Sequence, residues 1–515
     1  MGIFKSPFSP LALKEQTITE RVFEGLAGRP QDDVVLIDGP SGETMQAGAF
    51  VDSVKRLAGG LSAAGFGAGQ VVALMAPNMP AFGVVKHGAL WAGGTVTTIN
   101  PAYTAREVAH QLQDAGADIL FTTAAFIDTA RAAAEGSGVR RVVVMDGEGP
   151  DAMAALMGDP LEAQVPVDLD SHVAMMPYSS GTTGLPKGVM LSHRNLVANV
   201  DQCIAMGVIR PGDVTPCFLP FFHIYGMQVQ LNMFLAGGGT LVTLPRFDLE
   251  MFLRLAQEHR ARSLFIVPPV GLALAKHPLV DRFDLASVEI LMSGAAPLSG
   301  EITAAVSQRL GCDAFQGYGM SETSPVTLIN VPGKSVSGSV GVLVPSTEGR
   351  IVDVESGADL GPGEDGELWV RGPQVMIGYL NNDAATAATM PGEGWLRTGD
   401  IGHVDAEGNV FISDRLKELI KCKGFQVAPA ELEAELLSHP AIVDAAVIGR
   451  PDDEAGEVPV AFVVLAPGQG LSEAEVQAHV AGRLASYKHL RAVSFVESVP
   501  KSASGKILRR LLRDA

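Results

Sequence analysis

The chain alternates short runs of apolar, β-branched residues with longer stretches that have helical periodicity. Such runs occur at residues 71–75, 95–99, 173–178, 263–267 and 288–292. Because a strand covered by helices on both faces is apolar throughout, this alternation predicts an α/β fold of βα units on parallel sheets. Several runs lead directly into clusters of Gly, Pro and Ser. Open α/β sheets place their ligand-binding loops at such carboxyl ends of strands.

Two changes of pattern along the chain predict further units. Residues 337–404 contain short segments with frequent turns, which indicates a β-rich subdomain. Beyond residue 414 the pattern predicts a helix at 429–438 with Pro in its first turn, strands at 444–449 and 458–465, and a helix opened by the capping box Ser472–Glu475. We therefore expect an N-terminal domain at residues 1–416 and a small α+β C-terminal domain at 417–515, hinged near 414–417.

Charge and cysteine usage narrow the class of protein. The net charge of −19 over 515 residues argues against a nucleic-acid partner, although Lys and Arg gather at residues 415–423 and 501–513, where we expect nucleotide or CoA contacts. The four cysteines form no CxxC pair, which is typical of a reducing compartment. With no secretory leader and no apolar run of about 18 residues, the sequence predicts a cytoplasmic protein without a transmembrane segment.

A loop rich in Ser, Thr and Gly follows the apolar run at 173–178. Residues 179–188 read SSGTTGLPKG, so hydroxyls and unobstructed backbone N–H groups can surround phosphate oxygens while Lys187 adds positive charge. The spacing is not that of a Walker A loop, because Lys187 stands between Pro186 and Gly188. Taken alone, the loop could also be a flexible linker.

This loop and six further motifs resemble, in order, those of the adenylate-forming superfamily, which contains acyl-CoA synthetases, peptide-synthetase adenylation domains and beetle luciferases. The motifs are FHIYG at 222–226, SGAAPL at 293–298, QGYGMSE at 316–322, RTGD at 397–400, DRLKELIK at 414–421 and PKSASGK at 500–506. The segments PFFHIYG and KGFQVAPAELE are most similar to 4-coumarate:CoA ligases and their bacterial relatives. The resemblance implies an ATP-dependent, AMP-forming acid:CoA ligase.

Two positions depart from the plant-type pattern. Residues 319–326 read GMSETSPV instead of GMTEAGPV, as in many fatty acyl-CoA synthetases, and Cys422 replaces a common Tyr. A hydroxycinnamate-like aryl acid and a fatty acid therefore both remain open as substrates.

The resemblance also implies roles in adenylation. Lys506 is expected to reach the carboxylate of the acid and the α-phosphate, and Glu322 to ligate Mg²⁺. Thr182 and Thr183 would hold the pyrophosphate side, Tyr318 would stack beside adenine, and Asp400 and Arg415 would hold the ribose. The expected catalytic set is Lys506, Lys421, His223, Thr183 and Glu322. The expected ATP and AMP contacts are Ser179, Ser180, Gly181, Thr182, Thr183, Lys187, Gln316, Gly317, Tyr318, Ser321, Asp400, Arg415 and Lys506.

The remaining roles implied by the resemblance concern the acid and CoA. His223 is assigned to contact with the carboxylate or acyl-adenylate and not to general-base catalysis. The expected acyl pocket is formed by His223, Tyr225, Met292, Ala295, Gly317, Pro325 and Val326. The expected CoA contacts are Arg246, Lys423 and Gly424. Lys417 is the expected hinge, about which the C-terminal domain replaces its Lys506 face with its Lys421 face.

Other activities share the same motifs. An enzyme that loads a carrier protein would need every adenylation motif, and a light-emitting oxygenase is compatible with the fold. A catalytically inactive nucleotide-binding protein is a further alternative, although it would be expected to lack Lys506, Glu322, Asp400 or Arg415. The sequence specifies neither the acid nor the oligomeric state.

Overall fold

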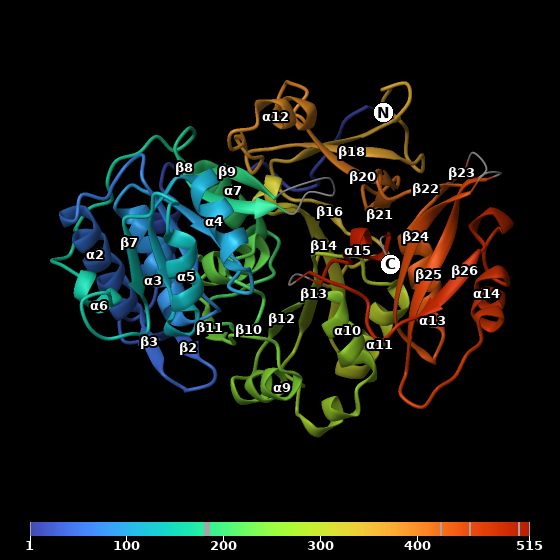
Figure 1. Cartoon of the computed structure of the whole chain (residues 1–515), viewed down its shortest axis with the longest axis horizontal. Coiled ribbons are helices and arrows are strands. Elements are labelled where there is room, and N and C mark those ends of the chain that lie inside the picture. The colour runs from blue at the N-terminus through green and yellow to red at the C-terminus, as the bar shows by residue number, and fades with distance from the viewer. Residues whose placement is uncertain (1, 180–185, 423–424, 453–454, 503–504, 514–515) are drawn as a thin grey trace.

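The computed structural model describes residues 2–179, 186–422, 425–452, 455–502 and 505–513. A large N-terminal part combines α/β layers with a β-rich sheet, and a smaller C-terminal domain, red in Figure 1, lies beside it. This architecture confirms the predicted α/β fold with two domains. The expected boundary near residues 414–417 falls between two strands, β21 (Val410–Arg415) and β22 (Ile420–Cys422), and its position stays a prediction.

A seven-stranded sheet forms the first layer; five neighbouring strands, which reach one edge of the sheet, are parallel, and the two at the other edge are antiparallel. Its order is β19 (Gly378–Tyr379), β9 (Lys187–Ser192), β8 (Val173–Ser179), β5 (Thr95–Thr98), β4 (Val71–Met75), β6 (Ala117–Thr122) and β7 (Arg141–Val144). Helical segments of this region are α2 (Ala47–Ala63), α3 (Pro80–Trp91), α4 (Ala105–Ala115), η1 (Ala124–Phe126), α5 (Ile127–Ala134), α6 (Met153–Leu156) and α7 (His193–Ala205). The predicted strands at 71–75, 95–99 and 173–178 are therefore confirmed to within one residue.

Two further sheets complete the α/β part. One contains β10 (Val214–Cys217), β11 (Thr240–Thr243), β2 (Val34–Asp38) and β3 (Thr44–Gln46), and the other β12 (Ser263–Ile266), β13 (Ile290–Ser293), β14 (Asp313–Gly319), β15 (Val326–Ile329) and β16 (Val342–Leu343). Their helical segments are α1 (Ile18–Ala27), the π-helix η2 (Tyr225–Asn232), α8 (Met233–Ala236), α9 (Leu249–Glu258), α10 (Pro268–Lys276), η3 (Pro278–Arg282), α11 (Gly300–Leu310) and η4 (Ser321–Thr323). The strand predicted at 288–292 begins two residues late, because the Val288 N–H closes a turn onto the Leu285 carbonyl.

The region predicted to be β-rich forms an antiparallel sheet. It contains β1 (Phe4–Lys5), β17 (Glu348–Val352), β18 (Gly366–Arg371), β20 (Leu396–Val404) and β21, and α12 (Asp383–Thr389) lies between β19 and β20 in sequence. In the register of β20 with β21, Asp400 is paired with Arg415. Two residues expected to share a ribose thus lie opposite each other on neighbouring strands.

The C-terminal domain has its own sheet and core. Its strands are β22, β23 (Phe425–Val427), β24 (Ile442–Asp452), β25 (Gly456–Leu465) and β26 (Ala492–Phe495), and its helical segments are α13 (Pro429–Ser438), α14 (Glu473–Ala481), η5 (Ser486–Lys488) and α15 (Arg509–Arg513). The predicted helix at 429–438 is confirmed. So is the capping box: the Glu475 N–H donates to the Ser472 hydroxyl, and the Glu475 carboxylate accepts the Ser472 N–H.

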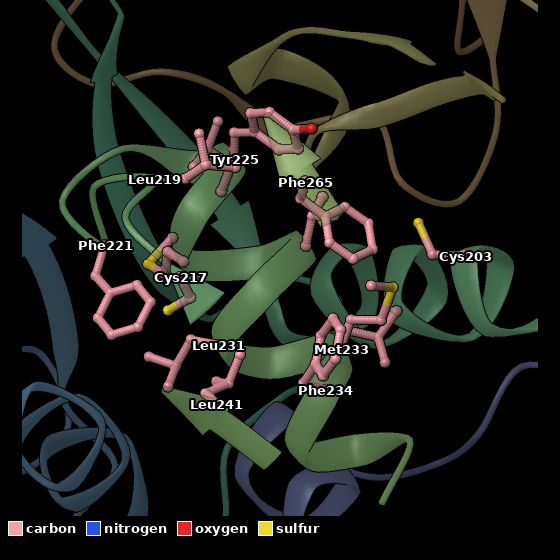
Figure 2. Packing of buried hydrophobic residues seen from close by; sticks show 14 of the residues in the cluster. Cys203, Cys217, Leu219, Phe221, Tyr225, Leu231, Met233, Phe234, Leu241 and Phe265 are labelled. Carbon is pink, nitrogen blue, oxygen red and sulfur yellow. The ribbon is translucent and has the colours of Figure 1, made fainter. Parts of the chain in front are cut away.

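A continuous apolar core joins the layers of the N-terminal part. Figure 2 shows a section in which the side chains of β11, β12 and the π-helix interdigitate, with Tyr225 at one end of the group. The rings of Phe234 and Phe265 meet nearly at right angles with centroids 5.5 Å apart. Within the described ranges, no helix combines the length and apolar character needed to cross a bilayer.

Close packing at α2 gives the first testable prediction. A Cβ added at Gly60 would lie 1.6 Å from the Leu156 carbonyl oxygen, so Gly60→Ala forces the chain before Gly158 to move although Ala is the better helix former. We expect the free energy of unfolding to fall by about 1–3 kcal/mol, the usual cost of overpacking. Urea denaturation followed by circular dichroism measures it.

The matched control is Gly28→Ala, whose added Cβ would meet nothing closer than the Gly25 carbonyl oxygen at 3.5 Å. This variant should unfold like wild type. If both variants are equally stable, the close approach of α2 to Leu156 is wrong.

Candidate active site

A pocket of about 460 Å³, its open mouth included, lies where β13 and β14 end and the π-helix begins. It is lined by His223, Ile224, Tyr225, Met292, Gly294, Ala295, Gly317, Tyr318, Gly319, Met320, Ser321, Pro325, Val326 and Lys506. All seven residues expected to form the acyl pocket are in this set. The same pocket also receives Tyr318 and Ser321 from the nucleotide set, and Lys506 from the C-terminal domain.

The local backbone explains why these residues meet. β13 and β14 are parallel neighbours, so their carboxyl ends, Ser293 and Gly319, open at the same edge of the sheet. The chain then turns back as β15, and a Cβ at Gly319 would lie 2.0 Å from the Pro325 carbonyl oxygen. Only Gly permits that approach, which brings Pro325 and Val326 to the pocket.

Tyr318, Asp400 and Arg415 form one hydrogen-bonded group. The Tyr318 hydroxyl donates to Asp400 Oδ2 at 2.5 Å, and Arg415 Nε lies 3.4 Å from Asp400 Oδ1. Burial raises the pKa of Asp400, and Arg415 opposes that rise by stabilising the carboxylate. Burial likewise raises the pKa of Tyr318, so it remains a neutral donor. Tyr318 is therefore bonded to the expected ribose acceptor.

Glu322 anchors a second group, which contains Ser179, Tyr379 and Lys187. Its Oε1 accepts from the Tyr379 hydroxyl at 2.8 Å and from the Ser179 hydroxyl at 3.3 Å, and only 6% of Glu322 is exposed. Lys187 Nζ lies 4.9 Å from the centroid of the Tyr379 ring. Ser180, Gly181, Thr182 and Thr183 lie outside the described residues. Tyr379 was missed by sequence reasoning, because the two-residue strand β19 carries no recognisable motif.

The donor set around Glu322 fits Mg²⁺. This ion binds through one or two carboxylates together with phosphate oxygens, and Glu322 supplies one buried carboxylate whose oxygens face neutral hydroxyls. No group of three or more His, Cys, Asp or Glu suited to a metal occurs among the described residues. A magnesium ion here would therefore need ligands beyond Glu322, such as the phosphates of a nucleotide and water.

Lys506 is a half-buried cation in this pocket. The pKa of its amine is lowered to about 8, mainly by burial and further by Arg415, whereas Asp400, Glu322 and Glu418 oppose the shift. Its loop is held by a hydrogen bond from the Ser502 N–H to the Lys506 carbonyl. Next to Lys506, a Cβ at Gly505 would meet the Val267 and Pro269 side chains at 3.5 and 3.6 Å, so this C-terminal loop packs directly on the N-terminal domain.

His223 lies at the same pocket in its neutral form. Burial and, to a smaller extent, nearby Lys506 together lower its pKa to about 3. Its Nδ1 accepts the Tyr225 N–H at 3.2 Å, so the neutral ring carries its proton on Nε2. A ring of this pKa is a hydrogen-bond donor and a poor general base at neutral pH, in keeping with the role expected from the sequence.

Other expected site residues do not line the pocket. Gln316 is buried, and its Oε1 accepts the Leu298 N–H at 2.7 Å, so the side chain supports the 293–298 loop. Arg246, Lys417 and Lys421 are exposed. Lys423 and Gly424 lie outside the described residues. The sequence expectation placed Lys421 at the site only in a second orientation of the small domain.

The fold and this arrangement of groups define an adenylate-forming enzyme. The chain belongs to the AMP-binding enzyme family: the model of the AMP-binding enzyme matches residues 23–380, and that of its C-terminal domain matches residues 431–506.

Named relatives agree with this membership over nearly the full length. The chain is 41% identical to 4-coumarate–CoA ligase 5 of Oryza sativa subsp. japonica, covering 99% of this chain and 97% of the relative. Among solved structures, ATP-bound MatB from Rhodopseudomonas palustris superimposes with a TM-score of 0.89 at 30% identity, over 97% of this chain and 99% of that one. A benzoate CoA ligase from Burkholderia xenovorans LB400 gives 0.87 at 26% identity, over 97% and 100%. The predicted class, an AMP-forming acid:CoA ligase that uses ATP and CoA, is confirmed by these matches.

The lowered pKa of Lys506 gives a prediction about the free protein. Because its folded pKa is about 8, the amine is charged below that pH and loses its charge as pH rises through it. After reductive ¹³C-methylation of the lysines, NMR should show a resonance that titrates near pH 8 and is missing in Lys506→Met. A spectrum in which Lys506→Met removes only a resonance with an ordinary pKa would contradict the buried position.

Proposed function

We propose that this protein joins a compact aryl carboxylic acid to CoA, and that the structure corresponds to the orientation used for the first half-reaction, formation of the acyl-adenylate. The observation that carries the proposal is the position of Lys506. It comes from the C-terminal domain, yet it lies in one pocket with Tyr318 of the nucleotide group and with His223 and Tyr225 of the apolar group.

In the first half-reaction the carboxylate of the acid attacks the α-phosphorus of ATP, and pyrophosphate leaves. Two anions must meet, so the rate depends on positioned cations and N–H donors. Lys506 is proposed to bridge the carboxylate and the α-phosphate. Asp400 accepts the ribose hydroxyls with help from Arg415, and Tyr318 packs against adenine. The neutral Nε2–H of His223 donates to the carboxylate, which it can do without changing protonation state.

The phosphate side is proposed to be held by Ser179 and Lys187 together with the 180–183 loop. Glu322 would ligate the Mg²⁺ that accompanies ATP, and Tyr379 and Ser179 hold its carboxylate in place through hydrogen bonds. A magnesium ion held there would supply positive charge to offset that of the pyrophosphate group.

The shape of the apolar end favours an aryl acid over a long fatty chain. Gly317 leaves space in front of Met292, since an added Cβ would touch its Sδ at 3.5 Å. The Tyr225 ring packs on Gly294, and its hydroxyl is 3.4 Å from the carbonyl oxygens of Ile266 and Met292, so it closes the inner end. Behind Tyr225 lies the packed core of Figure 2. A flat ring with a short arm fits this depth, whereas a long chain would have to displace core side chains. The relatives named for 4-coumarate and benzoate also support aryl acids.

In the second half-reaction the CoA thiol attacks the acyl-adenylate and AMP leaves. We propose that the domain beginning at residue 417 rotates about Lys417, which is exposed and free of the packed core. That rotation would remove Lys506 and bring Lys421, Lys423 and Gly424 to the pocket, with Arg246 binding the phosphates of CoA. The four buried free cysteines suit a reducing compartment, and we propose the cytoplasm.

The substrate assignment is tested by AMP release from purified protein with ATP, Mg²⁺ and CoA. Hydroxycinnamates and benzoates should give CoA-dependent turnover with kcat/KM at least about tenfold above that of C10 to C16 fatty acids, since misfitting the pocket by a few methylenes costs at least about 1.4 kcal/mol. Preference for the fatty acids would reject the aryl assignment. Adenylate formation that ignores CoA would indicate a carrier-protein partner, and ATP binding without AMP release an inactive nucleotide-binding protein.

The proposed role of Lys506 separates the two half-reactions. Lys506→Ala should slow acyl-adenylate formation by about 10²-fold or more, the usual cost of removing one transition-state donor. Thioester formation from supplied acyl-adenylate and CoA should keep most of its rate, because Lys506 has then left the site. Single-turnover assays measure both steps. Equal losses in the two half-reactions would contradict the domain rotation.

A further inference from the structure

Helix α13 begins without a cap of its own. Its first residue, Pro429, has no N–H, and the cap position is Ala428, whose side chain cannot accept a hydrogen bond. The free N–H of Ala430 in the first turn therefore needs an acceptor from elsewhere. Asp414 supplies it: its Oδ2 accepts the Ala430 N–H at 2.8 Å, and its Oδ1 accepts the Arg415 N–H at 2.6 Å.

This cap reaches α13 from the other side of the proposed hinge. Asp414 belongs to β21 in the β-rich sheet of the N-terminal part, where it is paired with Ile401, and only 6% of it is exposed. Ala430 belongs to the C-terminal domain, on the far side of Lys417. Where a side chain caps another helix, as Thr17 caps α1, Thr104 caps α4 and Ser472 caps α14, it belongs to the residue directly before that helix. The bond to α13 instead joins two units that are proposed to rotate against each other.

A series of contacts connects α13 with the segment that carries Lys506. Glu433 of α13 accepts two hydrogen bonds from the Arg509 guanidinium, at 2.7 and 2.8 Å, and Arg509 also donates to the Val447 carbonyl and pairs with Glu418. Arg509 opens α15 three residues after Lys506. The position of α13 thus fixes the base of the segment that carries Lys506.

We propose that Asp414 is a positioning residue that holds the C-terminal domain in the adenylate-forming orientation by capping α13 across the hinge. The inference rests on the proposed two-orientation function and adds a residue to it. A charged oxygen on a helix N-terminus is favourable, because the N–H dipoles point toward it. We call this hydrogen bond between Asp414 and the Ala430 N–H the latch. Because it is a single hydrogen bond, it is weak enough to open in every turnover.

The test compares the two half-reactions in Asp414→Ala. Losing one cap contact should slow acyl-adenylate formation by about fivefold, because the Lys506 orientation becomes less populated. Thioester formation from supplied acyl-adenylate and CoA should be unchanged or faster, since it uses the other orientation.

A second variant, Ala430→Pro, removes the N–H donor of the same hydrogen bond instead of its acceptor and should change the two half-reactions in the same way. Two prolines are tolerated at a helix start in this chain, because α10 begins with Pro268 and Pro269. This second variant keeps the test open if Asp414→Ala folds poorly.

Two controls distinguish a latch from a merely structural cap. Ser472→Ala removes a cap within the C-terminal domain and should leave the ratio of the two half-reactions unchanged. Adding Ala428→Asp to Asp414→Ala gives α13 an acceptor from its own domain, which should restore thermal stability and amide protection of the α13 first turn but not the rate of adenylation. Any of three results would overturn the latch. The double variant could recover adenylation, Asp414→Ala could slow both steps equally, or adenylation could be unslowed in both Asp414→Ala and Ala430→Pro. Wild type that forms no adenylate would instead overturn the proposed function.

Discussion

The placement of one cation, Lys506, is the constraint on which the rest of the site depends. Lowering the pKa of this amine from 10.5 to about 8 corresponds to about 3 kcal/mol of unfavourable free energy for the charged form. Arg415 adds repulsion, and the nearby carboxylates offset only part of the cost. Without substrates, the nearby carboxylates therefore compensate the charge of Lys506 only in part, and this charge favours the binding of anions in the pocket. In the proposed function the triphosphate and the carboxylate of the acid would supply them, so the interaction would become most favourable where the two substrates meet.

Burial disfavours the charged form of Lys506, so packing and hydrogen bonds elsewhere in the C-terminal domain have to keep its side chain in the pocket. The Lys506 loop packs on Val267 and Pro269 of the N-terminal part, and Arg509 ties the base of the loop to α13. Asp414 then ties α13 to β21. Of these contacts, the Asp414–Ala430 hydrogen bond and the packing of Gly505 cross between the two domains, and contacts of this kind suit the proposed rotation, since a large apolar interface would hold one orientation too firmly.

Much of this could be predicted from the sequence, for reasons that particular residues make clear. The buried strands around 71–75 and 173–178 are apolar throughout, so periodicity alone identified them. The seven acyl-pocket residues were expected from the resemblance to the adenylate-forming superfamily. They meet in one pocket because their motifs lie near the ends of η2, β13 and β14, and neighbouring parallel strands end at one edge. Their roles stay predictions, as do those of the 180–183 loop. Sequence could not identify Tyr379, which reaches Glu322 from a two-residue edge strand. Nor could it show that Gln316 is turned to the Leu298 backbone, because side-chain direction depends on tertiary neighbours.

The last two residues of β21, Asp414 and Arg415, connect the proposed ribose contacts with the proposed rotation of the C-terminal domain. Side chains alternate between the faces of a strand, so Arg415 turns toward Asp400 while Asp414 turns toward α13. A ribose held by Asp400 and Arg415 would steady the same stretch of backbone that presents the cap, and a firm cap would steady the ribose contacts. Such coupling is reciprocal by thermodynamic necessity. Nucleotide occupancy should therefore favour the orientation that inserts Lys506. Once the acyl-adenylate has formed and pyrophosphate has left, the carboxylate charge that Lys506 is proposed to contact is gone, which should favour its release.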